Sequence, residues 1–148
     1  MQLTPNFADT ELGVAGASAE LVANATYICE QLLEPIRTQF GPLRVDDGYR
    51  DIDHNAAVGG KTLSYHLFQS TKSAADVVPL TAGVTMQQIF DWVRLESGLP
   101  FDEVIYETNP DGTPGCPHFQ IDSAVQPRRL AFTGTTGAGE VYTPAEVN

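Results

Sequence analysis

The sequence predicts a single α+β domain in which an antiparallel sheet is flanked by helices. Two stretches repeat apolar residues at helical spacing, several short segments have the pattern of strands, and two of these flank a turn sequence late in the chain. Helices and short strands combined in this way are typical of the α+β class. The length of 148 residues fits one domain of ordinary size.

The first helix is expected between Ser18 and Phe40. Ser18 is a suitable N-cap, and the glycine and proline at 41–42 end the helix. Pro35 lies inside the apolar stripe, so we predict a kink or a division there. The 17 residues before this helix are small and polar, and we expect them to lie extended on the surface. The stripe is formed by Leu21, Ala25, Ile28, Leu32 and Ile36.

Further along the chain, the pattern predicts short strands and a second helix. The strands are expected at 43–46, 74–78, 103–108 and 118–122, with an edge strand at 130–132. One or two helical turns are expected at 51–58, and Thr85 caps a helix that Gly98 ends. The turn sequence at 109–112 makes a hairpin of the third and fourth strands. The chain therefore divides into an extended segment (1–17), a domain (18–133) and a loose tail (134–148).

Charge and composition exclude several classes of partner. The chain has 8 basic and 19 acidic residues, a formal net charge of −11, which disfavours nucleic acid and anionic membranes. No stretch reaches the roughly 18 apolar residues that a membrane span needs. The N-terminus lacks the basic start and apolar run of a signal peptide. Cys29 is expected to be a buried apolar residue, whereas a metal role stays open for Cys116, two residues before a histidine.

The sequence holds only three histidines, at positions 54, 66 and 118. A catalytic zinc ion commonly takes three His or carboxylate ligands and leaves one position open. Asp76 interrupts an otherwise apolar strand, where a buried carboxylate needs a partner. Spacing alone leaves the alternatives open, because Asp76 could lie at a strand edge and His118 could be an ordinary hydrogen-bonded histidine.

Four segments, in this order, resemble zinc D-alanyl-D-alanine carboxypeptidases and phage L-alanyl-D-glutamate endolysins. The resemblance runs from about Leu3 to Tyr142, and VDDGYR with NAAVGG is its most specific part. The segments are the helix at 28–37, VDDGYR with NAAVGG at 45–60, SYH with AAD at 64–76, and FDEVIYE at 101–107 followed by His118.

This resemblance implies the zinc peptidase fold of DD-carboxypeptidases and hedgehog-like proteins, and Zn²⁺ as the cofactor. It implies His66, Asp76 and His118 as ligands, with Arg50 holding a substrate carboxylate or the developing oxyanion. Ser64 would orient the ligand loop. For Arg50 the alternative is a surface salt bridge. His54 matches nothing in the motif and is expected to be a solvated helix residue.

Two departures from the family pattern concern the chemistry. Nine residues separate His66 from Asp76, where relatives have six that include a glycine, and the enlarged loop is expected to border the cleft. Many relatives place an acid three residues before the last histidine, and here that residue is Gly115. Glu107 is the best replacement as general base, and its alternative is an exposed strand-end carboxylate. Asp111 is a poorer candidate.

Two functional hypotheses follow. The first is a phage-encoded zinc peptidase that cleaves peptidoglycan stem peptides and stays in the cytoplasm until lysis or belongs to a virion. The second is a structural or adsorption component of a phage particle that reuses the fold, has weak or no activity, and contacts other phage proteins. Neither hypothesis involves nucleic acid or a membrane as a partner.

Overall fold

The computed structural model describes residues 1–137 and 141–148. Within them, six strands form one sheet in the order β3-β4-β6-β5-β7-β8. Neighbouring strands are antiparallel except β5 and β7, which are parallel. The predicted α+β class is confirmed, although the sheet is mixed. The strands are β3 (Leu43–Asp47), β4 (Lys72–Pro79), β5 (Glu103–Thr108), β6 (Pro114–Asp122), β7 (Leu130–Thr135) and β8 (Thr143–Ala145).

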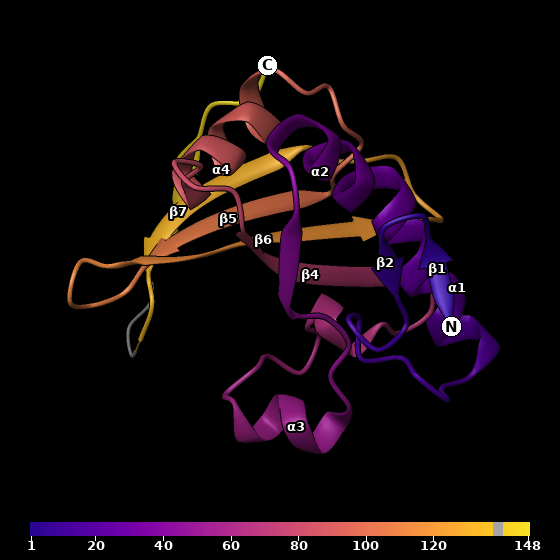
Figure 1. Cartoon of the computed structure of the whole chain (residues 1–148). Coiled ribbons are helices and arrows are strands. Elements are labelled where there is room, and N and C mark those ends of the chain that lie inside the picture. The colour runs from indigo at the N-terminus through magenta and orange to yellow at the C-terminus, as the bar shows by residue number, and fades with distance from the viewer. Residues whose placement is uncertain (138–140) are drawn as a thin grey trace.

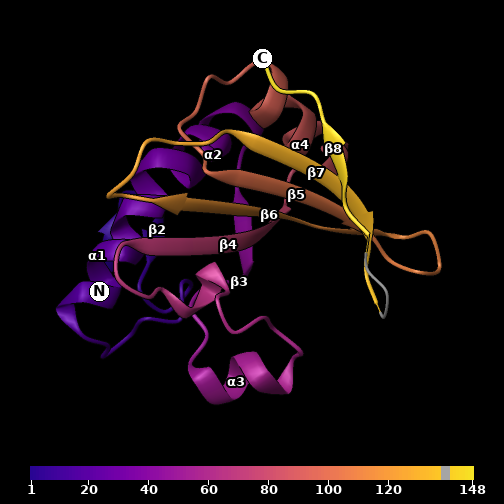
Figure 2. The same cartoon turned by 180° about the vertical axis from the view of Figure 1, so that it is seen from behind.

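The long helices cover one face of this sheet (Figure 1). They are α1 (Ala19–Ile28), α2 (Glu34–Phe40) and α4 (Met86–Leu95). Viewed from behind, the strands lie in front of these helices, so their opposite face is open to the viewer (Figure 2). Among the described residues, no helix is long and apolar enough to cross a membrane.

Pro35 divides the first predicted helix, as expected. Between α1 and α2 the chain forms a π-helical turn, Cys29–Leu33, closed by a bond from the Glu34 amide to the Cys29 carbonyl. Pro35 follows in the first turn of α2, where its missing N–H is tolerated. A wide turn of this kind accommodates a residue that cannot donate in the α-helical pattern. Gly41, at φ +87°, ends α2 as predicted.

The strands separate an apolar face from a polar one. On β5, Val104 and Tyr106 are buried in the core, and on β6 so are Phe119 and Ile121. Because successive residues of a strand point to opposite faces, His118 and its polar neighbours project from the open face. The core therefore lies between the sheet and the long helices. The polar side chains that could bind a ligand lie on the opposite, open face of the sheet.

The N-terminal segment is not the surface strand that its composition predicts. It forms a small hairpin, β1 (Gln2–Thr4) with β2 (Phe7–Ala8), that lies beside α1 in Figure 1. Phe7, Leu12 and Val14 are at most 1% exposed and belong to the core. The prediction was wrong because these three residues are separated by polar and small ones and have no helical or strand period.

The C-terminal part also differs from the prediction. The strand expected at 130–132 is not at an edge, because β7 lies between β5 and β8. Residues 141–148, expected to be loose, include β8, which pairs with Ala131, Phe132 and Thr133 of β7. Residues 138–140 of the predicted tail lie outside the described residues.

Two short helices connect β3 to β4, and the first of them stands away from the sheet. Asp51 caps α3 (Ile52–Ala57) by accepting a hydrogen bond from the His54 amide, so the predicted turns at 51–58 are confirmed. α3 projects beyond the sheet in Figure 1. A 3-10 turn, Tyr65–Leu67, then leads the chain back to β4.

The buried N-terminal segment predicts a large stability effect of a change there. Leu12 is fully buried, and its carbonyl accepts a hydrogen bond from the Tyr49 amide at 2.9 Å. Leu12→Ala should lower the free energy of unfolding by about 2–5 kcal/mol, measured by denaturant titration. Leu63→Ala should change it by less than about 0.5 kcal/mol, because Leu63 is 76% exposed. Equal effects of the two changes would contradict a core role for the segment.

Candidate metal centre

Three side chains with metal-binding atoms converge on the open face of the sheet. Asp76 on β4 is the cross-strand neighbour of His118 on β6, and His66 lies in the 3-10 turn before β4. Asp76 Oδ1 lies 2.9 Å from His118 Nδ1 and 3.5 Å from His66 Nε2, and the two nitrogens are 3.2 Å apart. Among the described residues this is the only such group.

The spacing of these three atoms fits a zinc ion. Tetrahedral zinc with bonds of 2.0–2.2 Å separates its ligand atoms by about 3.3–3.6 Å. The three observed separations, 2.9, 3.2 and 3.5 Å, lie within this range or a few tenths of an ångström below it. Two imidazoles and one carboxylate are also a common donor set of catalytic zinc sites, which keep a fourth position open.

Hydrogen bonds set the direction of both imidazoles. His66 Nδ1 lies 2.6 Å from the Gly48 carbonyl, to which it can only donate, so Nε2 keeps its lone pair for a metal. His118 Nε2 lies 3.1 Å from Gln120 Oε1, to which it donates, so the other nitrogen, Nδ1, faces Asp76 and His66. The two histidines thus present different ring nitrogens to one point.

The charges of the centre stabilise one another. Burial works to raise the pKa of Asp76, but the contacts of its carboxylate with the His118 and His66 rings outweigh burial and hold the pKa of Asp76 well below its ordinary value. Burial likewise works to lower the pKa of His118, and the Asp76 carboxylate reverses this and raises it. An ionised carboxylate between two imidazoles is an electrostatic environment that suits a cation.

The enlarged loop between His66 and Asp76 turns away from the centre. Phe68 and Ser70 take positive φ values of 48° and 55°. The side-chain amide of Asn24 on α1 donates to the carbonyls of both residues, at 3.1 and 2.7 Å. The loop is thereby held against α1, and none of residues 67–75 lines the cavity. The expectation that it borders the cleft was wrong.

A cavity of about 340 Å³ opens above the three atoms. Two basic side chains, Arg50 and Lys61, and two acidic ones, Glu103 and Glu107, are among the residues that line it. Lys61 Nζ lies 5.3 Å from the centre of the Tyr142 ring, and the Tyr142 hydroxyl donates to Glu107 Oε1 at 2.6 Å. These contacts link the loop after α3, the chain before β8 and β5 around the cavity.

Arg50 lines the cavity and also forms an ion pair. Its Nε donates to Asp47 Oδ2 at 2.6 Å, and its Nη2 lies 3.9 Å from Asp76 Oδ2. Its backbone N–H donates to the His66 carbonyl at 2.8 Å. Arg50 is therefore in a salt bridge and also lies beside the candidate metal centre, and its role toward a substrate stays a prediction.

Glu107 occupies the neighbourhood of the acid that Gly115 lacks. A Cβ atom added to Gly115 would lie 3.8 Å from the Cβ of Glu107 and only 2.5 Å from the Glu107 carbonyl oxygen. A larger residue at 115 therefore requires the strands to move. The side chain of Glu107 leaves the backbone close to position 115, and it lines the cavity above the cluster.

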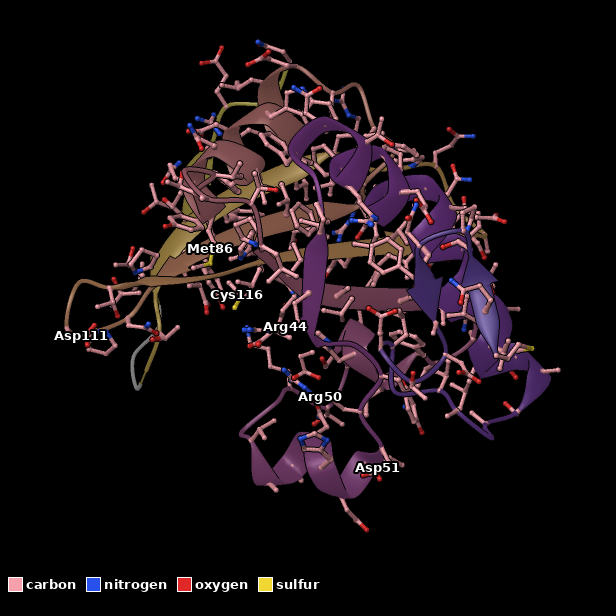
Figure 3. The ribbon with its side chains drawn as sticks, viewed as in Figure 1. Arg44, Arg50, Asp51, Met86, Asp111 and Cys116 are labelled. Atoms are coloured by element: carbon pink, nitrogen blue, oxygen red, sulfur yellow. The ribbon has the colours of Figure 1, made fainter. Side chains whose placement is uncertain are left out.

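The other sequence candidates lie apart from the reacting centre or support it. Asp111 lies at the tip of the β5–β6 hairpin, far from Arg50 in Figure 3, and bonds to Thr113 in its own turn. His54 is exposed on α3, as predicted. Ser64 Oγ accepts from the His66 amide at 3.3 Å, as expected of a residue that orients the loop.

The cysteines take no part in the three-atom cluster. Cys29 is fully buried in the core, as predicted. Cys116 lines the cavity, and its thiol donates to Asp46 Oδ2 at 3.6 Å. Burial first, and then the Asp46 charge, raise the pKa of the Cys116 thiol to about 12. The metal role left open for Cys116 therefore has no support from the cluster, which consists of His66, Asp76 and His118.

Sequence reasoning missed the residues that orient this centre. These residues are Gln120, which contacts His118, and Asn24, which holds the loop at 68–70. The polar Gln120 on the same strand face as His118, two residues on, was the available signal for a hydrogen-bonded neighbour. No sequence signal connected Asn24 to the loop at 68–70.

The mixed sheet and the His–Asp–His cluster define an α+β protein with a candidate metal centre on the open face of its sheet. A family model described as Peptidase M15 matches residues 5–104. The chain therefore belongs to the peptidase M15 family. The match includes His66 and Asp76 and ends before His118, which the structure brings into the same cluster. A search of curated proteins finds no match.

Proposed function

We propose that this protein is a zinc-dependent peptidase that cleaves peptidoglycan stem peptides and is encoded by a bacteriophage. The observation that supports it most is the convergence of His66 Nε2, Asp76 Oδ1 and His118 Nδ1 at the base of an open cavity. When bound, zinc would supply a Lewis acid for the scissile carbonyl and a means to activate water at neutral pH. Membership of a peptidase family agrees with this use.

The charged walls of the cavity suit a short peptide. Arg50 can hold a substrate carboxylate, as its planar fork of donors suits that group. Stem peptides offer such carboxylates at their ends and side chains. Lys61 adds a second positive charge to the wall of the cavity.

Glu107 is the proposed general base. It would accept the proton of the attacking water at its carboxylate and return it to the leaving amine. The Tyr142 hydroxyl, 2.6 Å from Glu107 Oε1, fixes the orientation of the carboxylate. This assignment replaces the acid that relatives carry at the position of Gly115.

The proposed setting is that of phage lysis or infection. The protein would reach the cell wall from the cytoplasm at lysis, or as part of a virion in contact with other phage proteins. Its proposed partner is peptidoglycan, and its charge of −11 argues against nucleic acid.

A second candidate function is a structural or adsorption component of a phage particle with weak or no activity. The specific observation in its favour is Gly115, since the carbonyl of Glu107 leaves no room for an acid there. In this case the chain would bind wall peptides or zinc without hydrolysis.

One experiment separates the two functions. Purified protein is loaded with zinc, its metal content is measured, and it is incubated with peptidoglycan while new amino termini are counted. The peptidase predicts about one zinc per chain and new termini that a chelator prevents. His118→Ala should lose both, and His54→Ala, a change at an exposed histidine, should lose neither. Zinc without new termini favours the structural role, and a parent without zinc contradicts the proposal.

A further inference from the structure

A chain of hydrogen bonds leads from the metal centre to the far end of the sheet. His118 Nε2 lies 3.1 Å from Gln120 Oε1, and Gln120 Nε2 donates to Asp102 Oδ2 at 3.1 Å. Arg128 then donates to both oxygens of Asp102, at 2.8 and 2.7 Å. Gln120 and Asp102 are 8% and 1% exposed, so water competes little for these bonds.

The donors and acceptors in this series of hydrogen bonds can be assigned in only one consistent way. Arg128 is always a donor, so Asp102 must accept from it. Burial works to raise the pKa of Asp102, but the bonds from Arg128 and Gln120 outweigh it and lower the pKa, so the carboxylate only accepts. Gln120 must therefore turn its NH₂ group toward Asp102 and its carbonyl oxygen toward His118. His118 Nε2 must then carry a proton, so Nδ1 is the ring nitrogen that could give its lone pair to a metal ion.

The backbone holds this chain in place. The Asp102 amide donates to the Gln120 carbonyl at 2.9 Å, and the Leu130 amide donates to the Asp102 carbonyl at 3.0 Å. Arg128 belongs to the connection from β6 to β7, which brings β7 parallel to β5. The direction of the His118 ring thus depends on a residue of the crossover connection.

We propose that Gln120 is a positioning residue for metal binding, with its amide direction set by Asp102 and Arg128. Gln120 holds the His118 ring with Nδ1 toward the metal and Nε2 protonated. The inference rests on the proposed metal centre and adds the determinant of its geometry. Groups that hydrogen-bond to the other ring nitrogen of a ligating histidine typically contribute 10–100-fold in metal affinity.

Zinc affinity, measured by competition with a chromophoric chelator, tests this proposal. Gln120→Met keeps the length of the side chain and removes the acceptor, and it should weaken zinc binding by about 10–100-fold. Arg128→Met should weaken binding less, and this side chain is 52% exposed, so no cavity is left. Gln39→Met, a change at an exposed helix residue, should bind like the parent.

A spectroscopic measurement separates positioning from a loss of structure. In the zinc-loaded parent, ring-selective ¹H–¹⁵N spectra should show the His118 Nε2–H proton, protected from exchange by Gln120. In zinc-loaded Gln120→Met this signal should be lost, while the signals of the core are unchanged. A parent that binds no zinc overturns the proposed function and this inference together. Equal affinity and an unchanged His118 signal in Gln120→Met overturn this inference alone. An Arg128→Met variant that binds like the parent overturns the roles of Arg128 and Asp102.

Discussion

Asp76→Asn should abolish stoichiometric zinc binding at micromolar metal. The carboxylate is the only anionic member of the cluster and lies 2.9 and 3.5 Å from the two ring nitrogens. An amide of the same shape has no charge to offset the cation and has one oxygen in place of two. Removing a residue that hydrogen-bonds to a metal ligand typically weakens metal binding 10–100-fold. The loss of the ligand itself should therefore weaken zinc binding by more than about 100-fold.

The measurement is isothermal titration with zinc, combined with metal analysis after dialysis. Asp53→Asn is the matched control, because Asp53 is an exposed aspartate on α3. It should bind zinc as the parent does. Retention of parental affinity by Asp76→Asn would show that the metal, if bound, lies elsewhere. Hydrolysis of peptidoglycan should disappear together with zinc.

Glu107→Gln should lower the rate of peptide hydrolysis by about 10²–10⁴-fold and leave zinc affinity unchanged. The amide keeps the size of the side chain and can still bond to the Tyr142 hydroxyl, but it cannot take a proton from water. The loss should appear in kcat rather than in KM, because substrate is held by other groups.

Glu103→Gln is the control for this change. Glu103 lies on the same strand, faces the same cavity, and lies 3.9 Å from Arg128. It should retain most of the parental kcat. A Glu107→Gln variant that cleaves as fast as the parent would exclude Glu107 as the base. A loss confined to Glu103→Gln would transfer that role to Glu103.

The sequence predicts those elements whose pattern is local. The helix ended by Gly41, the strand at 103–108 and the helix capped by Thr85 all follow from periodicity and caps, and Thr85 forms the full capping box with Gln88. The buried N-terminal segment could not be predicted in this way, because Leu12 and Val14 pack through contacts distant in sequence.

The convergence of His66, Asp76 and His118 follows from family resemblance, and their assignment as ligands stays a prediction. The geometry around them depends on tertiary contacts that no local pattern encodes. The Gly48 carbonyl that holds His66 comes from the end of β3, and the Asn24 amide that holds the loop comes from α1. The parallel pairing of β7 with β5 could not be predicted either, because no local pattern shows which strand β7 will pair with.

The alternation of faces on β6 has a consequence for misfolding. His118 and Phe119 are consecutive, one on the open face and the other fully buried. A slip of β6 by one residue against β4 would place the imidazole in the apolar layer and the phenyl ring in the solvent-facing cavity. Such a register isomer would lose packing energy and the metal cluster in the same step. A stably folded but metal-free register isomer is therefore disfavoured, and correct strand alignment and metal competence arise together.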